Sequence, residues 1–293
     1  MRKIGVITDS HSGITQKQAE ELGIAVLPMP FYCGEDSFYE GISITREEFF
    51  EKLKAGNTVS TSQASPAEIM DIWRKELEKY DEVLFIPLTS GLSGACYTAM
   101  MLAQEEEFEN KVFVVDNCRI SVPMYRSVLD ALELIEEGFT AKEIKEILER
   151  EKDKSVIYIA VETLEFLKKG GRISASSATI GTALNIKPIL KCETENLYAY
   201  KKCRGFKKAR KEMLEAMKYD IEVTFKEYAD CGEVYLMAAT SADEETTKGW
   251  LEEIREYFPG MDVMCAPLTL GISCHTGEGA LGIGCSCRPK RIK

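Results

Sequence analysis

Short apolar runs alternating with helix-start signals restrict this chain to an α/β fold. Four of these runs are apolar throughout, as in strands buried on both faces of a parallel sheet. Helices should begin after Thr45, Ser65 and Thr140, because a glutamate three residues later completes a capping box in each case. We therefore expect an N-terminal α/β domain with a mostly parallel sheet flanked by helices. The four strand-like runs cover residues 4–7, 24–27, 83–86 and 112–115.

The second half of the chain has the pattern of a mixed sheet with helices. Residues 186–190 and 197–201 flank a turn and predict a hairpin. A chain of 293 residues fits two domains better than one core, and we place them at residues 1–155 and 156–293. Further strands are expected at 156–161, 234–239, 261–266 and 280–287, and helices at 163–169, 206–228 and 244–257.

The formal net charge of −11 excludes several classes of partner. Nucleic acid and steady residence on an anionic membrane both favour positive surfaces, so neither is expected. Transient contact with a membrane stays open. The N-terminus runs into the first strand without the apolar segment of a signal peptide, which favours a cytoplasmic protein.

The ten cysteines are better explained as buried thiols than as disulfides in a large chain without a secretory signal. The nearest approach to a metal pattern is Cys274 and His275 with Cys285 and Cys287, and it contains no Cys-x-x-Cys pair. In a strand, the Cys-x-Cys spacing places both thiols on one face. We expect no metal site.

Four short islands of glycine and small hydroxyl residues fall where strands or helices should end. Glycine lets a backbone approach a ligand closely, and hydroxyl and N–H groups donate to an anion without adding a charge. Arg172 and His275 are the only cation and imidazole among them. This set favours binding of a carboxylate or phosphate headgroup over catalysis. The islands are Ser60-Thr61-Ser62-Gln63, Thr89-Ser90-Gly91-Leu92-Ser93-Gly94, Gly170-Gly171-Arg172-Ile173-Ser174 and His275-Thr276-Gly277-Glu278-Gly279.

The island at residues 89–94 should lie where a strand passes into a helix over residues 91–108. Anions favour that position, because unpaired N–H groups and the helix dipole point toward it. The island lacks the lysine of a phosphate loop, so nucleotide binding has little support. Asp9 and Ser10 end the first strand, where ligand-facing residues are common, although a cap or turn explains that pair equally well.

Two other classes of function stay open, an enzyme and a regulatory protein. Ser93 partly matches the nucleophile elbow of a hydrolase, with His11 or His275 as base, but Ala95 stands at the second glycine position. A phosphotransferase that uses the glycine loops is a second enzymatic reading. A regulatory protein that senses a small anion would use the same donors in a polar pocket without a tunnel for a tail.

Taken in order along nearly the whole chain, the same segments resemble the DegV family of bacterial fatty-acid-binding proteins. Each match is weak by itself, but the ordered set is specific. The matching segments are Val6-Ile7-Thr8-Asp9-Ser10, Thr61-Ser62-Gln63-Ala64-Ser65-Pro66, Thr89-Ser90-Gly91-Leu92-Ser93-Gly94, Leu167-Lys168-Lys169-Gly170-Gly171-Arg172-Ile173 and His275-x-Gly277-x-Gly279-x-x-Gly282.

The resemblance implies a non-enzymatic protein that holds one long-chain fatty acid between two α/β domains, without a metal or other cofactor. The carboxylate would be bound by Thr61, Ser93 and His275, and the tail would lie in an apolar tunnel. Burial of about fourteen methylenes would release on the order of ten kcal/mol. The expected ligand-binding residues are Asp9, Ser10, Thr61, Ser62, Thr89, Ser90, Ser93, Gly94, Arg172 and His275.

The resemblance also implies a separate kinase that makes an acyl phosphate from the bound acid. Arg172 and Arg204 match family arginines and are expected to contact this partner. Two positions depart from frequent family prolines: Ala64, and Glu278, which we expect to face solvent. Residues 116–124 keep an aspartate and a later serine of the family but lose a usual glycine pattern, and the bulky side chains at residues 122–125 bear on the length and shape of the acyl chain.

Overall fold

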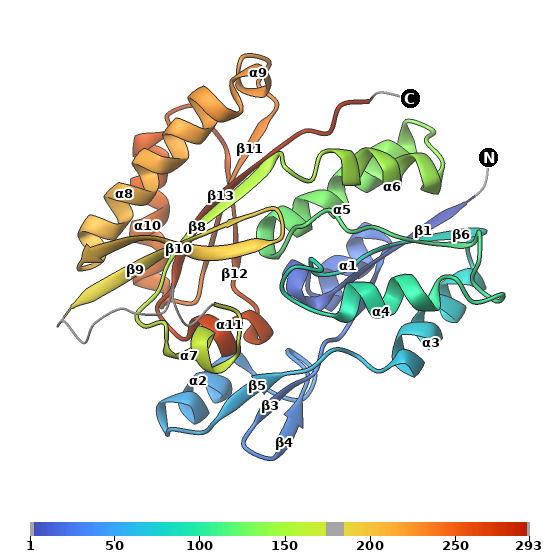
Figure 1. The fold of residues 1–293 in the computed structure, drawn as a ribbon, viewed down its shortest axis with the longest axis horizontal. Coiled ribbons are helices and arrows are strands. Elements are labelled where there is room, and N and C mark those ends of the chain that lie inside the picture. Colours follow the sequence, from blue (N-terminus) through green and yellow to red (C-terminus); the bar gives the residue numbers. More distant parts are fainter. Residues whose placement is uncertain (1–2, 174–184, 292–293) are drawn as a thin grey trace. The chain divides into compact units, whose positions relative to one another are not determined.

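The chain folds into two α/β units, and the computed structural model describes residues 3–173 and 185–291. Unit 1 contains Met1–Asp153 together with Pro289–Lys293, and unit 2 contains Lys154–Arg288. The expected fold class is confirmed: the first sheet is parallel and the sheet of unit 2 is mixed (Figure 1).

The main sheet of unit 1 has four strands, and every neighbouring pair is parallel. Gly5 pairs with Val83, and Val83 pairs with Val112 on its other side. The four apolar runs therefore form strands as predicted. In sheet order the strands are β2 (Ala25–Leu27), β1 (Ile4–Asp9), β6 (Glu82–Ile86) and β7 (Val112–Val114).

Helices cover both faces of this sheet, because successive side chains of a strand point to opposite sides. Leu84 and Ile86 pack in a core with α1, α5 and α6, whereas Val83 and Phe85 pack with α3 and α4. Trp73 of α3 meets Phe85 edge-on, with ring centroids 5.9 Å apart. The helices are α1 (Gln16–Leu22), α3 (Pro66–Leu77), α4 (Ala95–Leu102), α5 (Ser121–Glu136) and α6 (Ala141–Arg150).

The three predicted capping boxes are confirmed. Thr45 caps α2 (Arg46–Lys54), Ser65 caps α3 and Thr140 caps α6. In each box the cap hydroxyl accepts a hydrogen bond from the glutamate N–H, and the glutamate carboxylate accepts one from the cap N–H. Local side-chain chemistry therefore sets where these helices begin.

The helix predicted over residues 91–108 is too long, because α4 covers only Ala95–Leu102. The carbonyl of Thr89 accepts hydrogen bonds from the N–H groups of Leu92 and Ser93 at 3.2 and 3.3 Å. Residues 89–94 therefore form a turn, in agreement with a composition of serine, threonine and glycine.

Unit 1 also contains a three-stranded antiparallel sheet that sequence analysis did not predict. Each strand has only three residues, which is too short to show an alternating pattern. Phe31 of the central strand contacts Phe49 of α2 edge-on, with ring centroids 5.5 Å apart. In sheet order the strands are β4 (Asp36–Phe38), β3 (Phe31–Cys33) and β5 (Val59–Thr61).

Unit 2 is built on a six-stranded sheet in which β11 and β12 are parallel and the other neighbours are antiparallel. The predicted hairpin is confirmed as β9 and β10, with an irregularity between Ala199 and Lys201. In sheet order the strands are β10 (Asn196–Arg204), β9 (Ile186–Glu193), β8 (Ser155–Ala160), β13 (Leu281–Cys287), β11 (Val234–Thr240) and β12 (Val263–Pro267).

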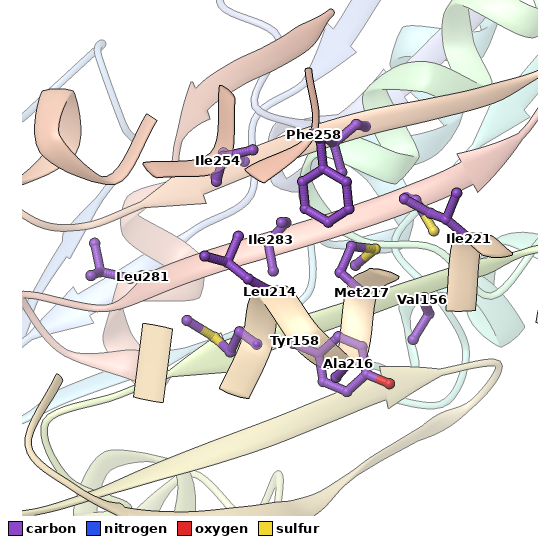
Figure 2. Packing of buried hydrophobic residues seen from close by; sticks show 14 of the residues in the cluster. Val156, Tyr158, Leu214, Ala216, Met217, Ile221, Ile254, Phe258, Leu281 and Ile283 are labelled. Atoms are coloured by element: carbon purple, nitrogen blue, oxygen red, sulfur yellow. The ribbon is translucent and has the colours of Figure 1, made fainter. Parts of the chain in front are cut away.

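Two helices, α8 (Phe206–Tyr219) and α10 (Glu244–Tyr257), bury one face of that sheet. Met217 of α8 lies among Val156 and Ile283 from the strands (Figure 2). Cys285 and Cys287 belong to the same buried cluster, in agreement with the face that their spacing predicts. Their role is that of small apolar side chains.

The helix predicted over residues 206–228 is interrupted. After α8, the chain forms the π-helical turn η2 (Asp220–Thr224) and the short helix α9 (Lys226–Ala229). The buried Asp220 carboxylate accepts from the Tyr158 hydroxyl at 2.6 Å and from Thr224 Oγ1 at 2.9 Å. A buried carboxylate needs such partners, and Tyr158 lies on a distant strand that local helix propensity cannot take into account.

Candidate functional site

Asp9 joins the ends of two neighbouring strands in unit 1. Its Oδ2 accepts from the N–H of Leu88 at 2.7 Å, just beyond the end of β6. Its Oδ1 accepts from the His11 N–H and contacts His11 Nδ1, both at 2.9 Å, and caps the 3-10 turn η1 (Ser10–Ser12). Asp9 is only 1% exposed, so these bonds account for its position. A direct contact of Asp9 with a ligand stays a prediction.

Ser10 is linked to the Thr-Ser-Gln island through residues 29 and 30. Its Oγ accepts from the Met29 N–H at 3.1 Å, and the Pro30 carbonyl accepts from the Ser62 N–H at 3.2 Å. Thr61 ends β5 and is half-buried, and Ser62 is exposed. The structure therefore brings the first two groups of predicted site residues to one region of unit 1.

The turn at residues 89–94 is built around the buried Thr89. The Thr89 N–H donates to the Arg119 carbonyl at 3.1 Å, and Thr89 Oγ1 accepts from the Gly91 N–H at 3.2 Å. The next N–H, of Ser90, donates to Asp116 Oδ1 at 3.2 Å. Thr89 directly follows Leu88, so the turn starts beside the Asp9 carboxylate.

Ser93 and Gly94 lie at the start of α4, beside Gln63 of the Thr-Ser-Gln island. Ser93 Oγ accepts from the Ala95 N–H at 3.2 Å, and a hydroxyl that accepts in this way keeps its own hydrogen for donation. Gln63 Oε1 accepts from Thr98 Oγ1 at 3.2 Å and lies 3.8 Å from the position of a Cβ on Gly94. The two hydroxyl islands of unit 1 therefore form a single cluster.

Sequence analysis did not assign Asp116 and Arg119 to the site. Both support the 89–94 turn, one through its carboxylate and the other through its carbonyl. The sequence position of Asp116 could have indicated a place in the site, because Asp116 follows the apolar run of β7 at the carboxyl edge of the parallel sheet. No local signal marks the carbonyl of Arg119.

In unit 2, the Gly-Gly-Arg island forms a Schellman motif at the end of α7 (Glu165–Lys169). Gly171 has φ +70°, its N–H donates to the Lys168 carbonyl at 3.1 Å, and the Arg172 N–H donates to the Leu167 carbonyl at 3.0 Å. Arg172 Nη1 donates to the Gly170 carbonyl at 2.5 Å. The motif sets the position of Arg172; Ser174 lies outside the described residues.

The His-x-Gly-x-Gly island packs against that motif. His275, on α11 (Leu270–Thr276), lies so close to Gly170 that a Cβ there would be 2.2 Å from His275 Nδ1. In return, a Cβ on Gly277 would lie 2.9 Å from the Phe166 ring of α7. Gly170 thus leaves room for the ring of His275, and Gly277 leaves room for the ring of Phe166 in α7. The structure brings Arg172 and His275 into one cluster of unit 2.

Arg204 lies in another part of unit 2, where β10 passes into α8. It is exposed and borders a surface hollow of about 460 Å³. The lining residues are Arg204, Lys207, Lys208, Lys211, Glu212 and Glu215. The hollow therefore has a majority of positive side chains in a chain whose formal net charge is −11.

Three departures from the family pattern also have definite positions. Glu278 is half-buried. Val122 and Met124 are buried in unit 1, within the first turn of α5. Ala64 is completely buried in the core between the sheet and α3.

Within residues 3–173 and 185–291, no cluster of three or more His, Cys, Asp or Glu side chains is placed to hold a metal ion. Over the same described ranges, no helix is both long and apolar enough to cross a bilayer. Unit 1 gathers hydroxyls and backbone amides, and unit 2 gathers the imidazole of His275 and the guanidinium of Arg172. Either kind of group can bind an anion, the first through neutral hydrogen bonds and the second through charge-assisted ones.

Comparison with known proteins identifies the family. Residues 3–287 match the family model described as "Uncharacterised protein, DegV family". The protein DegV of Bacillus subtilis is 30% identical over 289 residues, 97% of this chain and 99% of that protein. A solved DegV family protein from Thermus thermophilus, described by its fatty acid binding, is 33% identical with a TM-score of 0.86, covering 98% of this chain and all of that one.

The crystal structure of DegV from Bacillus subtilis, described as a fatty acid binding protein, is also similar. Its TM-score is 0.83 at 27% identity, over 98% of this chain and 100% of that one. Sequence and fold therefore agree over nearly the full length of these relatives. The chain belongs to the DegV family.

Proposed function

We propose that this chain binds a single long-chain fatty acid, with its carboxylate held by Thr61, Ser93 and His275 and its tail in an apolar tunnel. The observation that carries the proposal is the joining of two hydroxyl islands into one cluster around Gln63 and the first turn of α4. The DegV proteins from Thermus thermophilus and Bacillus subtilis are described as binding fatty acids, which supports this class of ligand.

The donor set suits a carboxylate that must give up its water. Removing water from a carboxylate costs several kcal/mol unless hydrogen-bond donors replace it. Ser93 Oγ accepts from the Ala95 N–H, which leaves its hydroxyl hydrogen for donation. A protonated His275 would add a charge-assisted bond. Burial of the tail would supply the affinity, at about 0.8 kcal/mol per methylene.

The first experiment is native mass spectrometry of the purified protein, followed by solvent extraction and identification of any fatty acid. One acyl chain per protein chain is expected. Oleate affinity is then measured by titration calorimetry for the wild type, Ser93→Ala and Thr61→Ala. Each substitution should weaken binding about ten-fold, the effect of losing one hydrogen bond to a charged group.

Ser60→Ala is a matched control, because successive side chains of β5 point to opposite faces of the sheet. This variant should bind oleate like the wild type. Unchanged affinity in both site variants would remove the headgroup assignment. A protein that carries no acid and does not bind oleate, but shows an esterase turnover lost in Ser93→Ala, would establish the hydrolase instead.

We further propose that Arg172 and Arg204 contact a separate kinase that phosphorylates the bound carboxylate. Positive side chains near a helix N-terminus interact unfavourably with the helix dipole. Arg204, Lys207 and Lys208 lie near the N-terminus of α8 and therefore do not stabilise that helix through its dipole. An acidic surface of a partner would complement them and favour association. The chain itself then performs no chemical step.

To test this contact, acyl phosphate formation is measured with a purified bacterial fatty-acid kinase and ATP. Arg204→Ala and Arg172→Ala should lower the rate about ten-fold or more while changing oleate affinity much less, as expected for truncated partner contacts. Lys248→Ala, an exposed lysine of α10, is the control. Equal losses of affinity and rate would make both arginines part of the fatty-acid site.

A further inference from the structure

The backbone that holds the 89–94 turn has a conformation that its residues do not favour by themselves. The Arg119 carbonyl accepts the Thr89 N–H at 3.1 Å. Cys118 and Ser121, close on either side of Arg119, have φ values of 59° and 57°. Neither is glycine, and each such residue costs on the order of 1–2 kcal/mol. Other contacts must therefore hold this segment in place.

The side chain of Arg119 provides those contacts. Although charged, it is only 2% exposed. Its Nη1 donates to Ser127 Oγ of α5 at 3.0 Å, and its Nη2 donates to the Glu151 carbonyl beyond α6 at 3.4 Å. Asp130 Oδ2 lies 3.9 Å from Nη1 and balances the charge. The guanidinium thus fastens its own backbone to α5 and to the residue that follows α6.

Ser127 connects a second residue of the same segment. Its Oγ accepts from Asn117 Nδ2 at 2.7 Å and donates to the Pro123 carbonyl at 3.0 Å. Arg119 and Asn117 therefore share one hydroxyl, and the segment between β7 and α5 is attached to α5 from both sides of Cys118. Removing the guanidinium would leave this buried network incomplete, which is costly in a medium of low dielectric constant.

We propose that Arg119 is a positioning residue for the carboxylate site. Its buried side chain fixes the carbonyl that holds Thr89, and so keeps the turn that carries Ser93 ready to bind. A turn that is already ordered loses less conformational entropy when a ligand binds. The proposal rests on the proposed function, and it adds a residue that does not touch the ligand.

The experiment compares Arg119→Met with Arg126→Met. Methionine replaces the stem of either side chain and removes the charge. Arg126 is a matched control, because it is also mostly buried and pairs with Asp130, but its ion pairs to Asp130 and Glu133 lie within α5. Two quantities are measured: amide hydrogen exchange of Thr89 and Ser90 by NMR, with Leu84 of β6 as internal reference, and oleate affinity.

In Arg119→Met, the Thr89 amide should lose most of its protection while Leu84 keeps its own, and oleate should bind about ten-fold more weakly. Arg126→Met should change neither quantity. Ser93→Ala should weaken binding less in the Arg119→Met background than in the wild type, because both changes act through one turn. Arg119→Lys, which keeps a donor for Ser127, should recover part of both losses.

Wild-type protection of Thr89 in Arg119→Met would overturn the proposal, as would equal losses in the two methionine variants. If Arg119→Met does not fold, the same measurements on Arg119→Lys decide: protection of Thr89 below the wild-type level supports the proposal, and wild-type protection overturns it. A wild type that fails to bind oleate would refute the proposed function. The exchange of Thr89 would still show whether Arg119 holds the turn.

Discussion

Gly170 and Gly171 are neighbours, but each must be glycine for a different reason. Gly170 has φ −74°, which any residue can adopt, and it is required because a Cβ would lie 2.2 Å from His275 Nδ1. Gly171 has φ +70°, and a Cβ there would meet nothing within 4 Å, so its requirement is one of backbone conformation. The first glycine positions an imidazole and the second ends a helix.

Gly170→Ala should therefore displace the imidazole and weaken oleate binding about ten-fold, whereas Gly171→Ala should cost about 1–2 kcal/mol of stability and leave the ring in place. The chain has two histidines, His11 and His275, so imidazole NMR signals are readily assigned. Gly249→Ala, with open space in α10, is the control and should raise stability slightly. Unshifted His275 signals in Gly170→Ala would contradict this explanation.

At the scale of one element, α3 shows how a helix start depends on a charged carboxylate. Glu68 Oε2 accepts from the Ser65 hydroxyl and the Ser65 N–H, each at 2.7 Å, and Oε1 accepts from the Tyr39 hydroxyl at 2.9 Å. Hydrogen bonds from the Ser65 side chain and backbone lower the pKa of Glu68 below its ordinary value of 4.5. The ionised form of Glu68 is therefore the one that caps the helix.

A carboxyl group whose pKa is lower in the folded state stabilises the fold above its unfolded pKa, and that contribution disappears as the pH falls through the folded pKa. Glu68→Gln should lower the free energy of unfolding at pH 7 by about 1 kcal/mol, measured by urea titration. Its difference from the wild type should shrink below about pH 4. The exposed Glu51→Gln serves as control; a difference independent of pH would show that the charge of Glu68 is unimportant.

At the scale of the whole molecule, the last residues of the chain belong to unit 1 although they follow unit 2. Sequence analysis assigned the whole C-terminus to the second domain. Arg291 pairs with Glu133 at 3.2 Å and with Glu137 at 3.1 Å, both at the end of α5, and Arg150 Nη2 donates to the Lys290 carbonyl at 2.9 Å. These half-buried ion pairs fasten the terminal segment to the helices of unit 1.

Arg291→Ala should therefore loosen α5 and leave α10 of unit 2 unchanged. Hydrogen exchange with mass spectrometry would follow both helices, and the loss in α5 should correspond to about 0.5–1 kcal/mol, the size of a partly exposed ion-pair network. Lys248→Ala, with its exposed pair to Glu244, is the matched control. Faster exchange in α10 as well as α5 would show a general loss of stability instead.

The sequence by itself determined those features whose cause is local. Apolar runs specify β1, β6 and β7, capping boxes start α2, α3 and α6, and the β9–β10 hairpin follows from its turn. The hydroxyl and glycine islands were also visible, because small residues at the ends of elements have a conformational reason to be there.

Only the tertiary structure decided which islands meet and what holds them. The helix passes into a π-helical turn at Asp220, whose buried carboxylate accepts from Tyr158 on a distant strand, and a Cβ on Gly170 would collide with the ring of His275, which is remote in the sequence. The carbonyl of Arg119 holds Thr89, and its buried side chain bonds to Ser127 of α5 and to the Glu151 carbonyl beyond α6. Such contacts join residues far apart in the chain, so they cannot be predicted from hydrophobic periodicity or local propensity.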